Sequence, residues 1–221
     1  MKKATVLCLL KVVVDVAVIV MVTISAIMMF VYGGEALSST GIEFLKYFTV
    51  QSNLLAGALM IIALPFDLLL LFGRRDSIPL GIKLLPFISS IGTSLTMLTV
   101  LVYLGPTMGY PFMFTGANLF MHLLTPLGMI VRTMILEEKE PRLSFSHSFL
   151  GIAHMTLYGI YYLTNIAVNN GYGTTQYDWY GFGAGGIGVG IAVYFVMILM
   201  TYGISWLTYF LQKRICLFPQ E

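Results

Sequence analysis

Two short polar stripes carry residue types that could perform nucleophilic catalysis. In the first, Thr49, Ser52 and Asn53 are spaced three and four residues apart, so they share one face of a helix. The second stripe has the same kind of spacing and consists of Asn118, His122 and Thr125. A hydroxyl group and an imidazole form the minimal pair for a nucleophile activated by a general base. The two stripes therefore indicate nucleophilic catalysis, provided that the fold brings them together.

The positions of the two stripes within their helices predict that the stripes lie close together. Both stripes lie within about 10 Å of the starts of their helices, at the helical rise of about 1.5 Å per residue. Pro126 cannot donate a hydrogen bond to the carbonyl of His122, and a freed carbonyl is common where a helix lines a cavity. We therefore expect Thr49 and His122 at similar depth on neighbouring helices, with Asn53 or Asn118 as an oxyanion donor. The alternative is that Thr49 bonds only within its own helix and His122 is a packing residue.

Further polar side chains belong to the same half of the predicted bundle. Ser52 lies beside the nucleophile candidate, and Tyr161 and Asn165 lie on the outer part of a later helix. These three are predicted to contribute to a polar substrate pocket. Another polar group is better explained as interhelical hydrogen bonding, which is common in membrane bundles; it comprises Ser90, Thr93 and Ser94.

The composition predicts an all-α protein in a membrane. Of the 221 residues, 58% are hydrophobic and 10% are charged, and the mean hydropathy is +0.88. Soluble domains carry about 25% charged residues, so lipid must cover this surface. The net charge of +2 is too small to indicate a nucleic-acid partner. Cys8 and Cys216 match no metal motif, and no metal or other cofactor is expected.

Six apolar segments are long enough to cross a bilayer, which requires about 20 residues each. They are predicted as one transmembrane domain over residues 1–221, with helices at about 6–32, 47–72, 83–105, 117–136, 147–167 and 184–211. With the N-terminus inside, Lys46 is the only one of the twelve lysines and arginines on the outer side. The positive-inside rule therefore predicts a multi-pass protein of the cell membrane with both termini in the cytoplasm.

Two aspartates lie at membrane depth apart from these stripes. Asp15 follows Lys11 by one helical turn, and Asp67 precedes the Arg74-Arg75 turn. Ion pairs with these nearby cations are the expected roles. A proton or ion path that uses Asp15 is the alternative.

The sequence resembles a known family at two motifs. These motifs are Tyr47-Phe48-Thr49-x-x-Ser52-Asn53 and, some seventy residues later, His122-x-x-x-Pro126. They are similar to those of the androgen-induced protein and androgen-dependent TFPI-regulating protein family, and segment 177–182 looks like its bacterial six-span branch. The resemblance implies an intramembrane threonine hydrolase that cleaves fatty acid esters of hydroxy fatty acids. It assigns Thr49 as the nucleophile and His122 as the base.

Three functions follow from these observations. The leading prediction is a lipid-ester hydrolase that acts on a membrane lipid or lipid ester. The second is a non-enzymatic transporter or lipid-binding protein whose polar pocket holds a small ligand. A structural or regulatory bundle is the third.

Overall fold

The computed structural model describes residues 3–33, 39–137 and 143–215, and every regular element in this part is a helix, without a β-strand. Long apolar runs favour helices because the helix satisfies every backbone polar group within the segment. The longest elements are α1 (Lys3–Tyr32), α2 (Phe48–Leu71), α3 (Leu80–Thr99) and α9 (Ile187–Arg214). The remaining elements are η1 (Gly41–Lys46), η2 (Val100–Leu104), α4 (Gly105–Met108), α5 (Tyr110–Met113), α6 (Ala117–Leu119), η3 (Phe120–Leu124), α7 (Thr125–Ile130), η4 (Val131–Ile135), η5 (Phe145–Ile152) and α8 (Ala153–Val168).

Within the described residues, five helical segments are long and apolar enough to cross a membrane. They are Ala4–Tyr32, Phe48–Leu71, Leu80–Met108, Ala117–Ile135 and Ile187–Arg214. The helix predicted at 147–167 differs, because it is a 3-10 helix (η5) followed by the 16-residue α8. Serine side chains explain the irregular start: the Ser144 hydroxyl caps η5, and Ser148 donates to the carbonyl of Phe145.

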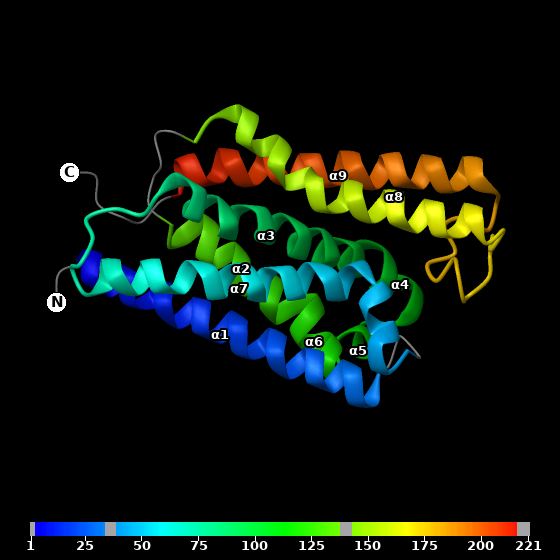
Figure 1. The fold of residues 1–221 in the computed structure, drawn as a ribbon, viewed down its shortest axis with the longest axis horizontal. Helices are drawn as coiled ribbons and strands as arrows, with labels where there is room; N and C mark the ends of the chain where they lie inside the picture. Colours follow the sequence, from blue (N-terminus) through cyan, green and yellow to red (C-terminus); the bar gives the residue numbers. More distant parts are fainter. Residues whose placement is uncertain (1–2, 34–38, 138–142, 216–221) are drawn as a thin grey trace.

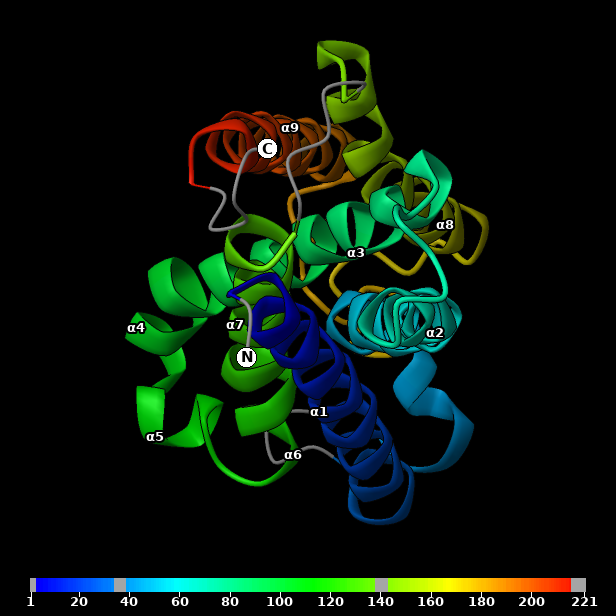
Figure 2. The same cartoon turned by 90° about the vertical axis from the view of Figure 1, so that its left-hand side faces the viewer.

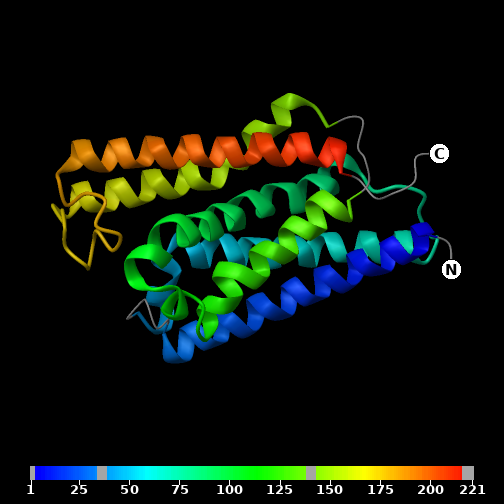
Figure 3. The same ribbon diagram turned by 180° about the vertical axis from the view of Figure 1, so that it is seen from behind.

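The helices run along one common direction (Figure 1). The start of α1 and the end of α9 lie at the same end of the bundle, together with the connection from α2 to α3 (Figures 1 and 3). In the end-on view, α1, α2, α3 and α7 form one group, and α8 and α9 lie beyond α3 (Figure 2). The first residues of α2 and α6, which carry the two polar stripes, lie at the end opposite the start of α1.

The core between α1, α2 and α7 is apolar and closely packed. It includes Val18 and Val22 of α1, Met60 of α2 and Met129 of α7. Gly57 permits the close approach of α1, because a Cβ atom at this position would lie 2.9 Å from Cγ1 of Val22. This packing places α2 beside the helical segment that carries His122.

Two π-helical turns directly precede prolines. The turn η3 ends just before Thr125-Pro126, and η2 ends just before Gly105-Pro106. Proline has no N–H group, so the regular bonding pattern cannot continue through it. In η3 the amide of Thr125 donates to the carbonyl of Phe120, five residues back. Such widened turns are frequent at functional sites, and this one contains His122.

Candidate active site

Thr49 lies in the first turn of α2 and is half-buried. The phenol oxygen of Tyr180 accepts a hydrogen bond from the amide of Phe48 at 2.9 Å and so caps this helix. Within the helix, the carbonyl of Thr49 accepts bonds from Oγ of Ser52 at 3.0 Å and from Nδ2 of Asn53 at 2.7 Å. Side-chain bonds thus fix the backbone of Thr49.

Asn53 joins α2 to the helix of His122. Its Nδ2 atom also donates to the carbonyl of Met121 at 3.1 Å. The two stripe-bearing helices are therefore neighbours at this depth. Asn53 is fully buried, and its Oδ1 atom has no hydrogen-bond partner among the described residues.

His122 is held by α5. Its Nδ1 atom lies 2.8 Å from the carbonyl oxygen of Met113, and the ring is buried. A carbonyl oxygen only accepts, so Nδ1 carries a proton, and in the neutral ring Nε2 has the free lone pair. This is the tautomer that a general base requires. The carbonyl of Met113 holds the ring in place of the carboxylate that usually orients a catalytic histidine.

Several buried polar atoms near this histidine are unsatisfied in the described part of the chain. They are Nδ2 of Asn118, Oγ1 of Thr125 and, on α2, Oδ1 of Asn53. Asn118 and Thr125 are 1% and 0% exposed. Buried polar groups nearly always have a partner, so each of these atoms is available to bond a ligand or a water molecule.

The structure does not join Thr49 to His122 directly. No hydrogen bond links the two side chains in the described residues; instead, Asn53 makes the contact between their helices. The ring of His122 bonds toward α5, which lies on the other side of α7 from α2 (Figure 2). Catalytic hydrogen bonds are often long or absent before substrate binds.

The other predicted pocket residues have separate contacts. Ser52 shares a hydrogen bond with Oγ1 of Thr96 on α3, at 3.2 Å. Tyr161 is 49% exposed, and Asn165 donates to the carbonyl of Tyr177 at 2.8 Å. The structure therefore does not bring Tyr161 and Asn165 to the group formed by Thr49, Asn53 and His122. A small apolar cavity lies elsewhere, between α8 and α9, lined by residues that include Met155, Tyr162, Leu163, Tyr194 and Met197.

A loop between α8 and α9 covers the start of α2. Asp178 organises this loop, because its carboxylate accepts bonds from the amides of Gly173 and Gly183, both at 2.9 Å, and from the Tyr162 hydroxyl. The carboxylate of Asp178 therefore bonds within the loop and to Tyr162, and it does not orient His122. Burial raises the pKa of Tyr180 to about 12, so this phenol stays neutral beside the amide of Phe48.

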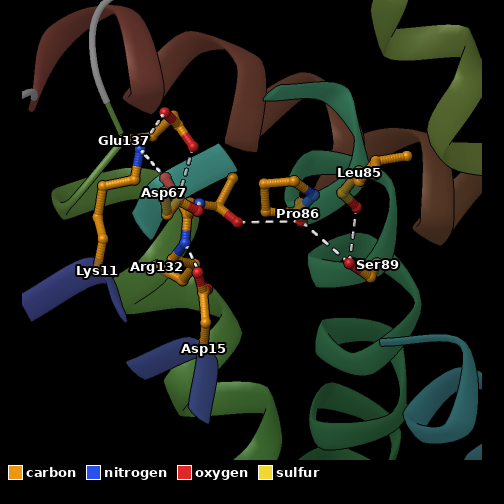
Figure 4. Close-up of polar contacts among 9 residues, drawn as sticks. Lys11, Asp15, Asp67, Leu85, Pro86, Ser89, Arg132 and Glu137 are labelled. Carbon is orange, nitrogen blue, oxygen red and sulfur yellow. Dashed lines mark hydrogen bonds and ion pairs between the residues drawn. The ribbon is translucent and has the colours of Figure 1, made fainter. Parts of the chain in front are cut away.

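A network of buried charged side chains joins α1, α2 and η4 (Figure 4). Lys11 of α1 pairs with Asp67 of α2 at 2.8 Å and with Glu137 at 3.1 Å. Arg132 of η4 binds Asp15, Asp67 and Glu137 through three different nitrogen atoms. All five residues are at most 1% exposed. The network fastens α1, α2 and η4 together.

This network corrects the ion pairs expected from the sequence. Asp15 pairs with Arg132 rather than with Lys11, and Asp67 pairs with Lys11 and Arg132. Arg74 and Arg75 are exposed instead. The expected pairs were local in sequence, whereas the observed ones join different helices.

Arg132 and Glu137 belong to the network but were missed as buried site residues. An arginine inside an apolar run of membrane length was the available signal, because such a charge needs a buried partner. For Glu137, burial favours the neutral acid, but Lys11 and Arg132 outweigh burial and lower the pKa to about 2.

Comparison of the chain with protein-family models, curated proteins and solved structures finds no match. The family resemblance seen at Thr49 and His122 stays a prediction.

Proposed function

We propose that this protein hydrolyses lipid esters within the membrane, at the outer end of its bundle. Thr49 is the nucleophile, His122 the general base, and Asn118 the donor to the oxyanion. The observation that carries this proposal is the bond from Nδ1 of His122 to the carbonyl of Met113. It leaves Nε2 as a base in a buried region where polar atoms have no partner.

The reaction follows from these roles. Nε2 of His122 takes the hydroxyl proton of Thr49 as Oγ1 attacks the acyl carbon. The tetrahedral oxyanion accepts a hydrogen bond from Nδ2 of Asn118, whose donors are unused in the described structure. Collapse of this intermediate expels the alcohol, which receives the proton from His122. Water then gives a proton to His122 and attacks the acyl-threonine, which releases the fatty acid and restores Thr49.

The membrane arrangement proposed here has six crossings with both termini in the cytoplasm. It counts η5 and α8 together as one crossing, because they run beside α9 (Figures 1 and 3). The common location of the start of α1 and the end of α9 supports an even number of crossings. The site of Thr49 then opens toward the outer leaflet, where lipid esters can enter.

Substitution of the two reacting residues tests the hydrolase proposal. Purified protein in lipid or mild detergent is assayed against a panel of acyl esters. Thr49→Ala should abolish turnover, and His122→Ala should lower it by about 10²–10⁴-fold, because each removes one half of an activated pair. Thr49→Ser should retain activity, since a hydroxyl group remains.

Two matched controls accompany these variants. Thr175→Ala removes an exposed threonine from the loop before α9, and His147→Ala removes the histidine near the start of η5. Both should turn over esters like wild type. Equal hydrolysis by wild type and Thr49→Ala would show that the nucleophile assignment is wrong.

Non-enzymatic binding of a lipid or small ligand is the second candidate function. The observation that favours it is the lack of a hydrogen bond between Thr49 and His122 in the described structure, together with unsatisfied atoms that a bound ligand would satisfy. Wild-type protein that binds esters but hydrolyses none of them would establish binding in place of catalysis.

A further inference from the structure

The buried network places two carboxyl groups on one edge of a single guanidinium group. Nε of Arg132 lies 2.7 Å from Oδ1 of Asp15, and Nη2 lies 2.7 Å from Oδ2 of Asp67. Nε and Nη2 present two parallel N–H donors on one side of the planar group, a side that usually binds both oxygens of one carboxylate. Oxygens from two different carboxyl groups therefore lie next to each other.

The negative charges of the two carboxyl groups are balanced by different numbers of nearby cations. Asp67 has a second cation, because Nζ of Lys11 lies 2.8 Å from its Oδ1 atom; this contact is an ion pair by distance, since Oδ1 accepts no hydrogen bond from the described residues. Asp15 has the Nε contact alone, and its buried Oδ2 atom has no hydrogen-bond partner among the described residues. Two adjacent carboxylates in a buried site repel strongly unless one of them is protonated. Asp15 is the less compensated of the two.

We infer that Asp15 and Asp67 form a proton-binding site in which Asp15 is the neutral acid. Its proton lies between the two carboxyl groups and removes the repulsion at the guanidinium edge. The charged groups that face Asp15 from the packed elements are Asp67 of α2 and Arg132 of η4, with Glu137 beyond them. On its own helix, Lys11 lies one turn earlier (Figure 4).

Release of this proton has a structural consequence. Asp15, Asp67 and Arg132 belong to α1, α2 and η4, so a second negative charge at the guanidinium edge weakens the contact of three helices at once. Asp15 lies in the first half of α1 and is fully buried. The exchangeable ligand of the site is a proton. This inference does not depend on the hydrolase proposal.

Infrared spectroscopy of the wild-type protein tests the site directly. Protein labelled with ¹³C at its aspartate carboxyl groups should show a carboxylic-acid carbonyl band at neutral pH, and this band should shift with the label. Asp15→Asn should lose the band. Asp76→Asn, which alters an exposed aspartate in the loop before α3, should keep it. A labelled wild-type protein without the acid band, or an Asp15→Asn protein that keeps it, overturns the inference.

Thermal unfolding gives a second readout of the proton on Asp15. If Asp15→Asn does not fold, the infrared spectrum of the labelled wild-type protein alone decides whether a neutral aspartic acid is present. The midpoint of wild type should fall as the pH is raised from mildly acidic to alkaline values, because the proton is lost. Asn at position 15 mimics the neutral acid, so the midpoint of Asp15→Asn should fall much less. Equal pH dependence of the two proteins contradicts the assignment to Asp15.

Discussion

At the scale of single residues, two asparagines near His122 have different tasks. Nδ2 of Asn53 donates to the carbonyls of Thr49 and Met121, so its donors hold two helices together. Nδ2 of Asn118 is buried and has no acceptor among the described residues. A donor that is already placed and unused is suited to charge that develops during a reaction. Under the hydrolase proposal, Asn118 is therefore assigned as the oxyanion donor in preference to Asn53.

Substitution of each asparagine should separate these tasks. Asn118→Ala should lower kcat for ester hydrolysis by about 10²–10³-fold, the usual effect of losing one oxyanion donor, with little change in melting temperature. Asn53→Ala should instead cost about 1–3 kcal/mol of stability, because it removes the buried bond to the carbonyl of Met121 that joins the two helices. Asn169→Ala, at the exposed end of α8, serves as the control. Full kcat in Asn118→Ala would reject its assigned role.

At the scale of helices, glycines determine how closely α8 approaches α9. A Cβ atom at Gly159 of α8 would lie 2.2 Å from the ring of Tyr194 on α9. Gly190 of α9 faces Leu163 of α8, where a Cβ atom would lie 3.1 Å from Cδ2. Small residues at helix contacts are typical of membrane bundles, because backbones can then pack closely.

Alanine substitutions at two glycines should therefore have opposite effects. Gly159→Ala should lower stability by about 1–3 kcal/mol, since the ring of Tyr194 must move. Gly203→Ala, also within a helix but with no atom within 4 Å of the added Cβ, should be neutral or stabilising by up to about 1 kcal/mol. Thermal unfolding in the same detergent compares them. Equal stability of the two variants would mean that this contact does not limit the packing of α8.

The elements also show which features the sequence could predict. The helices at 47–72 and 117–136 agree closely with α2 and with the segment Ala117–Ile135, because unbroken apolar runs define their ends. The start of α8 could not be predicted, since serine side chains around Ser144 and Ser148 form local bonds. The partner of Asp15 could not be predicted either, because Arg132 is 117 residues away in the chain.

The proposed pair of Thr49 and His122 shows the same limit of sequence-based prediction. Helical spacing predicts that Asn118 and His122 share a face, and the structure places Asn53 against the carbonyl of Met121. The spacing of residues along one helix does not show which neighbouring helix a side chain faces. The bond from His122 to the carbonyl of Met113 could therefore not be predicted. Tyr161 is 49% exposed, and its ring lies beside those of Tyr158 and Trp179.

At the scale of the whole molecule, exposed basic residues gather at one end of the bundle. Arg74 and Arg75 follow α2, and Lys213 and Arg214 end α9. The start of α1 lies at the same end (Figure 1). Positively charged loops are retained in the cytoplasm, so this distribution favours that end as the cytoplasmic one.

Cysteine labelling of intact cells should establish the orientation. In a background where Cys8 and Cys216 are replaced, Thr175→Cys should react with a membrane-impermeant reagent, and Ser77→Cys should react only after the cells are opened. Both positions are exposed, so access to the reagent depends on the side of the membrane. Labelling of Ser77→Cys in intact cells, with Thr175→Cys silent, would invert the proposed topology.

The identity of the nucleophile is tested most directly by locating the covalent intermediate. Purified wild-type protein is reacted with a fluorophosphonate probe or an activated acyl ester, digested, and analysed by mass spectrometry. The adduct should lie on Thr49, be absent from Thr49→Ala, and form far more slowly in His122→Ala. Ser52 lies one helical turn away and serves as an internal comparison, because its hydroxyl bonds to the carbonyl of Thr49 and to Thr96. An adduct on Ser52, or ester turnover without any adduct on Thr49, would contradict the proposed mechanism.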